Sequence, residues 1–165
     1  MNKEIKRYTI IAVLSALAVV INLFESFFIP PVQFGIRFGL ANIVSLVAIY
    51  FVGKKDMVLI NALRVIIANL LRGTIFALVF WISFGGVILS TIVIIILFQL
   101  KSSLLFTSII SAIAHSVGQV IVVVLVYNQV LIASIIPLLL ISSIVTGILT
   151  AFIAKLTLNR LKISL

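Results

Sequence analysis

The 165-residue sequence contains no cysteine and only three acidic residues, Glu4, Glu25 and Asp56. The absence of cysteine excludes disulfides, thiolate metal sites and cysteine nucleophiles. A phosphate-cradling Gly-x-x-x-x-Gly-Lys-Ser/Thr loop is also missing, so the chain hydrolyses no nucleotide by that route. Any energy input must therefore come from partners.

The chain is instead rich in apolar residues. They make up 64% of the chain, charged residues make up 9%, and the mean hydropathy is +1.48. These values lie far outside the range of soluble globular domains and indicate an integral membrane protein. The net charge of +9 does not indicate nucleic-acid binding, because basic residues beside membrane spans are what the positive-inside bias predicts.

The apolar runs predict one all-α domain over residues 1–165, a compact bundle of six transmembrane helices. A helix of about 20 residues crosses about 30 Å of hydrocarbon, so six spans with short turns use almost the whole chain. The Pro30-Pro31 pair ends the first run, and the Gly53-Lys54-Lys55-Asp56 stretch ends the second. The predicted helices cover residues 9–28, 38–52, 57–71, 74–100, 104–127 and 130–154.

Orientation follows from the positions of the cations. With both termini in the cytoplasm, nine of the twelve lysines and arginines fall on the inner side of the membrane. Arg37, Arg64 and Arg72 are left over, in or beside predicted spans. A cation at that depth is costly and is usually paired, placed in a wet cavity, or used to hold an anion. These three arginines are therefore the first candidates for a binding site.

Two predicted helices carry a polar face. In 57–71 the face recurs every three or four residues, and the same spacing holds in 104–127. Near the outer end of 9–28 lie three further polar residues, Asn22, Glu25 and Ser26. If the faces converge, they form a polar cavity that opens outward in the outer half of the membrane. The two helix faces consist of Asn61, Arg64, Ala68 and Arg72, and of Ser108, Ser111, His115 and Gln119.

Each candidate also has a structural interpretation. Arg64 and Arg72 could pair with Glu25 or with helix carbonyls, or reach an interface, instead of holding a ligand. The acidic Glu25 is expected to neutralise an arginine rather than to transfer protons. For His115 and Gln119 the alternative is a hydrogen bond between helices. A lone histidine without cysteine is a poor metal ligand, and we expect no metal site.

A small-residue face lies on the first predicted helix. Ala12 and Ala16 are four residues apart, and Ser15 and Ala18 continue the pattern. Small residues at this spacing let another helix approach closely. The pattern is common in membrane helices and indicates a docking face only together with other evidence.

Three stretches resemble a known bacterial family. They are Pro31–Asn42 (PVQFGIRFGLAN), the Gly85-Gly86 pair and Ala114–Gln119 (AHSVGQ). They resemble the heptaprenyl diphosphate synthase component I family, also called the Gx transporter family, over nearly the whole chain. In that family lysine is usual at the position of Arg37 and asparagine at that of Ser116. The first difference keeps the charge, whereas the second changes any contact made by the amide.

The family is similar to the S components of energy-coupling-factor (ECF) transporters, six-helix subunits that capture vitamins near the outer surface. By this resemblance, Ala12 and Ala16 would dock an ECF coupling subunit with its ATPases. The ligand would be an isoprenoid diphosphate, a quinone or a flavin, with no intrinsic cofactor. Localisation in the bacterial cytoplasmic membrane is also implied. The expected ligand-binding residues are Asn22, Glu25, Arg37, Asn42, Arg64, Arg72, His115 and Gln119.

The family description also names a synthase, and the residues do not fit that activity. Prenyl diphosphate synthases bind magnesium through aspartate-rich motifs, whereas this chain has one aspartate, Asp56. We therefore expect no catalytic residue. The leading hypothesis is an S-component-like binding subunit. The alternative is a non-catalytic accessory subunit of polyprenyl diphosphate or menaquinone metabolism, or of extracellular electron transfer. Its partner would be a prenyl synthase or an extracytosolic flavoprotein. A third interpretation is a purely structural assembly partner.

Overall fold

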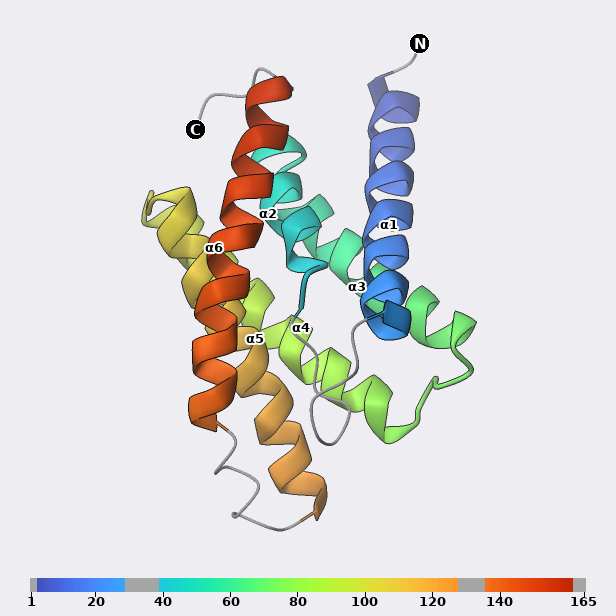
Figure 1. The fold of residues 1–165 in the computed structure, drawn as a ribbon. Helices are drawn as coiled ribbons and strands as arrows, with labels where there is room; N and C mark the ends of the chain where they lie inside the picture. Colours follow the sequence, from blue (N-terminus) through green and yellow to red (C-terminus); the bar gives the residue numbers. More distant parts are fainter. Residues whose placement is uncertain (1–2, 29–38, 128–135, 162–165) are drawn as a thin grey trace.

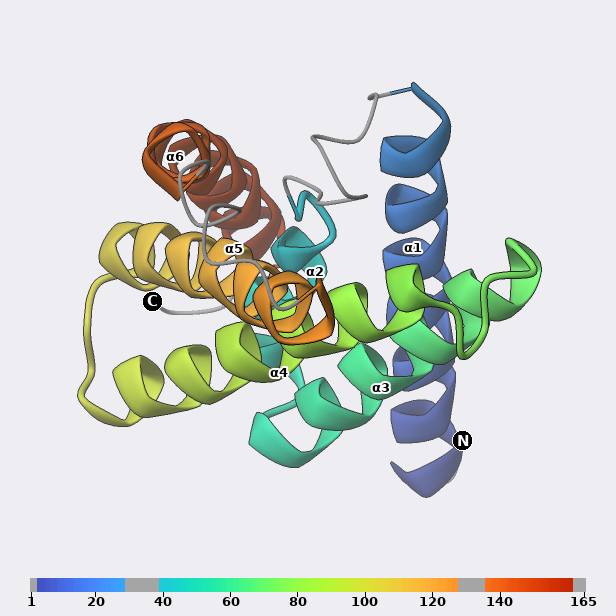
Figure 2. The same ribbon diagram turned by 90° about the horizontal axis from the view of Figure 1, so that it is seen from below.

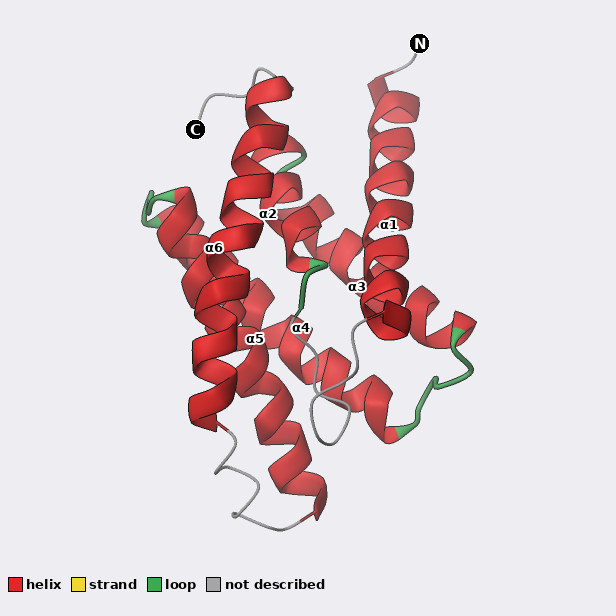
Figure 3. Ribbon diagram, in the orientation of Figure 1, coloured by secondary structure: helices red, strands yellow, loops and turns green. Residues whose placement is uncertain are grey.

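The computed structural model describes residues 3–28, 39–127 and 136–161. The described residues form six helices and no strand, which confirms the predicted all-α membrane fold (Figures 1 and 3). The helices are α1 (Lys3–Phe28), α2 (Asn42–Phe51), α3 (Lys54–Leu71), α4 (Leu78–Gln99), α5 (Leu104–Tyr127) and α6 (Ile136–Arg160).

Four helices are long and apolar enough to cross a membrane: α1, α4, α5 and α6. The other two are not candidate spans by length and hydropathy, although the sequence predicts six transmembrane helices. With 10 residues, α2 extends for about 15 Å, or about half of the hydrocarbon thickness. Helix α3 has 18 residues and includes Lys54, Lys55, Asp56 and Arg64, which lower its hydropathy.

The helix boundaries differ from the predicted ones for local reasons. Helix α2 begins at Asn42, because Gly39 has a φ of +77° and the next two residues form a turn. Helix α3 begins three residues earlier than predicted, directly after Gly53, whose φ is +88°. Helix α4 begins four residues later, since a run of turns with Phe76 at a φ of +61° precedes it. Residue 38 and residues 130–135 of the predicted helices lie outside the described residues.

Close contacts between backbones hold the second half of the bundle together. Figure 2 shows α4 and α5 side by side, and they pack where Gly85 and Gly86 face Gly118. Gly147 of α6 in turn packs against the backbone of Ile109. Small residues at helix contacts in membranes permit such approach. Helix α2 lies in the middle of the bundle and packs against α3 and α6, while α1 packs against α3.

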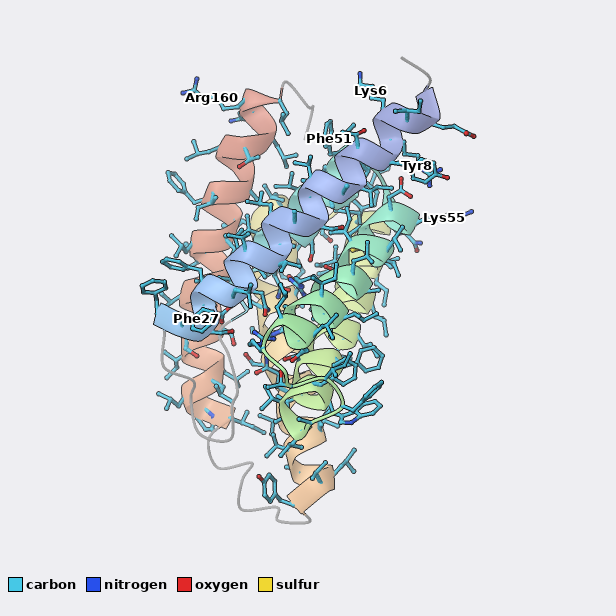
Figure 4. All side chains as sticks on the ribbon, turned by 90° about the vertical axis from the view of Figure 1, so that its right-hand side faces the viewer. Lys6, Tyr8, Phe27, Phe51, Lys55 and Arg160 are labelled. Carbon is cyan, nitrogen blue, oxygen red and sulfur yellow. The ribbon has the colours of Figure 1, made fainter. Side chains whose placement is uncertain are left out.

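The positive charges gather at one end of the molecule. The beginning of α1 and the end of α6 lie at this end (Figure 1), and Figure 4 shows Lys6, Lys55 and Arg160 there. Phe27 lies toward the other end of α1. This arrangement is the one expected if both termini face the side that the positive-inside bias makes cytoplasmic.

Candidate functional site

Polar side chains from four helices surround a small cavity beside the beginning of α2. The cavity measures about 10 Å³, which is enough for one water molecule and for no larger ligand. Sequence reasoning predicted that polar residues of these helices converge, but the cavity is far smaller than the ligand-sized one it predicted. The lining residues are Asn22, Glu25, Gly39, Ala41, Arg64, Val65, Asn69, Ser83, Val87, His115 and Gln119.

Arg64 is the buried cation of this cluster, with 1% of its surface exposed. Its two terminal nitrogens each lie 3.5 Å from Oδ1 of Asn42, which is long for a hydrogen bond. No described residue accepts a hydrogen bond from Arg64 Nε, and none pairs with Asn42 Nδ2. Buried polar groups are normally satisfied, because an unmade hydrogen bond leaves the cost of desolvation uncompensated. These two groups could therefore serve an additional acceptor such as an anion.

Glu25 is equally buried and faces the same cavity. Its carboxylate accepts hydrogen bonds from the backbone N–H groups of Gly39 at 2.7 Å and Leu40 at 3.1 Å. A side chain at position 39 would clash, since its Cβ would lie 2.8 Å from Cδ2 of His115. Glu25 thus attaches the beginning of α2 to α1, with Gly39 packed directly against the ring of His115.

Removing the Glu25 carboxylate should release this attachment. We expect Glu25→Ala to accelerate amide hydrogen exchange at Gly39 and Leu40, because their two N–H groups lose their acceptor. Leaving such a donor without an acceptor costs about 1 to 3 kcal/mol. Hydrogen exchange of a peptide that covers residues 39–41 measures the effect. Glu4→Ala, at an exposed position of α1, is the control and should leave the exchange unchanged. Equal exchange in Glu25→Ala and in the wild type would contradict this role.

Arg72, the third predicted arginine, is placed differently. Its Nη1 donates to Oδ1 of Asn22 at 2.8 Å and to Oγ of Ser26 at 2.5 Å, and its Nη2 donates to Oδ1 of Asn69 at 3.1 Å. These bonds join the end of α3 to the outer part of α1. Arg72 therefore joins two helices beside the cavity. Its contacts fit the alternative in which this arginine stabilises the fold instead of holding a ligand.

His115 and Gln119 form one pair on α5. Their Nε2 atoms lie 2.7 Å apart. Because an amide nitrogen only donates, His115 accepts this bond and is neutral in this arrangement. Gly86 of α4 lies against both side chains, since a Cβ there would be 2.8 Å from Gln119 Cγ and 2.9 Å from His115 Cε1. Gly86 thus gives the two polar side chains their space, while Gly85 faces Val122 and Gly118.

Other residues of the predicted polar faces make their hydrogen bonds away from the cavity. Asn61 bonds to Ser45 of α2 at 2.6 Å and to Thr91 of α4 at 2.8 Å. Ser108 bonds to the Gly147 carbonyl of α6 at 2.7 Å, and Ser111 bonds back to its own helix. Asn61 and Ser108 join helices, and none of the three residues lines the cavity. Helical spacing alone could not separate the two uses.

Among the polar residues that line the cavity, sequence reasoning missed one and left another unassigned. Ser83 lines the cavity from α4, and only its nearness to Gly85-Gly86 in the sequence could have indicated it. Asn69 lines the cavity as well and also accepts from Arg72. Among the described residues, no group of three or more His, Cys, Asp and Glu side chains is placed to hold a metal ion.

Two further predictions concern residues away from the cavity. Arg37 lies outside the described residues. Ala12 and Ala16 are exposed on α1, whereas Ser15 and Ala18 are buried, so the small-residue pattern divides between two faces of the helix. An exposed alanine face is compatible with docking and also with contact to lipid.

The comparisons with known proteins give one match. The model of the family described as heptaprenyl diphosphate synthase component I matches residues 14–157, which include most of α1, all of α2 to α5 and most of α6. Neither a curated protein nor a solved structure matches the chain. Every residue that lines the polar cavity falls within the matched range.

Proposed function

The chain belongs to the heptaprenyl diphosphate synthase component I family, and on that premise we propose that it is a membrane-embedded, S-component-like subunit that binds a small anionic or amphipathic ligand. The observation that carries the proposal is Arg64, a fully buried guanidinium with one free N–H group and only long contacts to Asn42 among the described residues. The ligand classes proposed are isoprenoid diphosphates, quinones and flavins.

The chemistry around Arg64 supports an anionic or strongly accepting group. Asn42 Nδ2 provides a second donor without a partner among the described residues. Arg64 and Asn42 are both almost completely buried. A charge-assisted hydrogen bond is strong in such surroundings. Glu25 lines the same cavity and offsets part of the positive charge when no ligand is bound.

Binding requires that the cavity expand, because about 10 Å³ holds no ligand of these classes. The turn at residues 39–41 is the part of the lining that belongs to no helix, and Glu25 holds it through the N–H groups of Gly39 and Leu40. We propose that this turn moves away from His115 when the ligand enters.

Equilibrium binding to the purified protein in lipid nanodiscs tests the proposal. The probes are flavin mononucleotide, a short-chain menaquinone, farnesyl diphosphate and inorganic diphosphate. We expect one of the first three to bind at a site that is lost in Arg64→Met, and to change the hydrogen-exchange protection of residues 39–41 relative to the protein without ligand. If none binds at millimolar concentration, the binding function is wrong.

The alternative function is that of a non-catalytic accessory subunit. The observation that favours it is the family description, which names one component of a synthase and so implies a partner component. The scattered acids agree with a non-catalytic role: Asp56 pairs with Arg7 at the basic end, and Glu25 binds backbone amides. Co-purification with a soluble prenyl synthase or an extracytosolic flavoprotein would favour this function. Co-purification with an ATPase and coupling module would favour the first.

The exposed alanines of α1 give a prediction about the partner. We expect Ala16→Leu to abolish co-purification of a coupling subunit but to leave ligand binding intact, because a larger side chain blocks close helix approach without touching the cavity. Ala12→Leu should act in the same way. Val20→Leu, at an exposed position that is already large, is the control. Equal loss of docking and ligand binding would indicate misfolding instead.

A further inference from the structure

The basic end of the molecule contains an open pocket of about 590 Å³ between the beginnings of α1 and α3 and the end of α2. Lys6, Arg7, Lys54, Lys55 and Asp56 line it, with Phe51 among the apolar residues. Arg7 Nε donates to Asp56 Oδ2 at 2.7 Å, and this bond holds the pKa of the Asp56 carboxyl below its usual range. Asp56 is therefore occupied by Arg7, which leaves the three lysines to face the pocket.

A long apolar groove begins at the same place. It measures about 410 Å³ and lies between α1 and α6, with Ile43, Val44 and Val47 of α2 as its floor. Val13 and Leu17 of α1 and Ile153 of α6 contribute to its walls. Along α1 the groove extends from Thr9 to Ile21, a rise of about 18 Å and thus more than half of the hydrocarbon thickness. Figure 1 shows α1 and α6 standing apart with α2 between them.

The pocket and the groove adjoin each other, because Ile10 and Phe51 line both. Figure 4 shows Phe51 near Lys6, at the end of the bundle that also carries Lys55. A charged pocket at the level of the lipid headgroups thus leads into an apolar groove that runs into the membrane. This arrangement matches a lipid with an anionic head and one apolar chain. Basic pockets between helices on the cytoplasmic side are known to bind phosphorylated lipid heads.

We propose that this surface binds a single-chain lipid diphosphate, such as a polyprenyl diphosphate, from the inner leaflet, with the diphosphate at Lys6, Lys54 and Lys55 and the chain along α1, α2 and α6. Charge favours a diphosphate over the phosphodiester of a common phospholipid. A phosphodiester carries one negative charge, whereas even a phosphate monoester carries about −1.5 to −2 at neutral pH. The single groove that leaves the pocket favours one chain over two.

This site is separate from the polar cavity. None of its residues lines the cavity around Arg64, and the cavity is too small for such a lipid in the described conformation. The inference therefore goes beyond the proposed function, and either can fail alone. Arg64→Met should leave binding at the basic end unchanged.

Binding of geranylgeranyl diphosphate to the protein in nanodiscs of neutral lipid tests the basic pocket that would hold the diphosphate. We expect the double variant Lys54→Gln/Lys55→Gln to weaken binding about 30-fold, since each basic residue near the headgroups contributes about a factor of five. The matched control is Lys101→Gln/Lys155→Gln, which removes two lysines that line a different pocket. An equal loss of affinity in both double variants would show that general surface charge causes the effect, and would overturn the proposal.

The groove is tested with a second variant and with altered probes. Val13→Trp fills the groove from an exposed position and should weaken binding at least tenfold, because the chain then loses its apolar contacts. Val126→Trp, at an exposed valine of α5 outside the groove, should change nothing. Geranylgeraniol and inorganic diphosphate should each bind far more weakly than the complete lipid. Equal displacement by phosphatidylglycerol, or full binding in Val13→Trp, would contradict a diphosphate site in this groove.

Discussion

Replacing Gly118 with valine is expected to separate α4 from α5 and to destabilise the bundle by about 3 kcal/mol, the upper part of the usual range for overpacking. Even the first added carbon would lie 2.5 Å from the carbonyl oxygen of Gly85 and 3.0 Å from Cα of Gly86. Both atoms belong to the backbone, so no side chain can rotate away. The helices must move apart, and this also withdraws Gly86 from His115 and Gln119.

The thermal unfolding midpoint in detergent, followed through the fluorescence of Trp81 on α4, measures this effect. Val117→Ile is the control, because it enlarges the neighbouring, half-buried position of the same helix. We expect a clear decrease of the midpoint for Gly118→Val and little change for the control. An unchanged midpoint for Gly118→Val would show that the two helices are not packed as closely as described.

Arg64→Met is expected to weaken ligand binding by about 2 to 5 kcal/mol, the range for truncating one partner of a buried charged hydrogen bond. The same substitution should leave the empty protein as stable as the wild type or more stable, because replacing a poorly paired buried charge with an apolar side chain is often stabilising. Glu25 keeps its two backbone donors in the variant, so it does not become an unpaired buried charge.

This pair of measurements separates a binding role of Arg64 from a structural one. If Arg64 only stabilised the fold, Arg64→Met would lower the unfolding midpoint and binding would fall with it. Arg72→Ala provides the contrast, since Arg72 makes three short hydrogen bonds to α1 and α3 and its loss should lower stability. The probe is whichever of flavin mononucleotide, the menaquinone and farnesyl diphosphate binds the wild type. Undiminished binding to Arg64→Met would contradict the anion site.

The sequence predicted the helical fold because its apolar runs are long and are separated by charges, glycines and prolines. It did not predict that α2 begins only at Asn42, because the residues before Asn42 in the predicted helix 38–52 are mostly apolar. Only the positive φ of Gly39 and the turn that follows set where the helix begins. The close contacts of Gly85 and Gly118 also depend on the relative rotation of α4 and α5, which a single sequence does not determine.

The candidate site was partly predictable for a similar reason. Burying a charged or amide group in a membrane helix is costly, so Arg64, Glu25 and Gln119 had to face the protein interior. Which interior contact each one makes depends on the neighbouring helix. Asn61 meets hydroxyl groups of α2 and α4, while Arg64, almost one turn further along, meets the cavity. The hydroxyl partners Ser45 and Thr91 carried no recognisable signal in the sequence.

The most direct test of a ligand site at Arg64 is native mass spectrometry of the gently extracted protein from its own host. Wild type and Arg64→Met are compared for bound small molecules and bound proteins in the same spectra. We expect the wild type to carry a flavin, a quinone or an isoprenoid diphosphate that a folded Arg64→Met variant lacks, whereas a lipid diphosphate held at the basic end should remain on both. A wild type with a stable protein partner and no small molecule, or a folded Arg64→Met variant that retains every small molecule found on the wild type, would contradict a ligand site at Arg64.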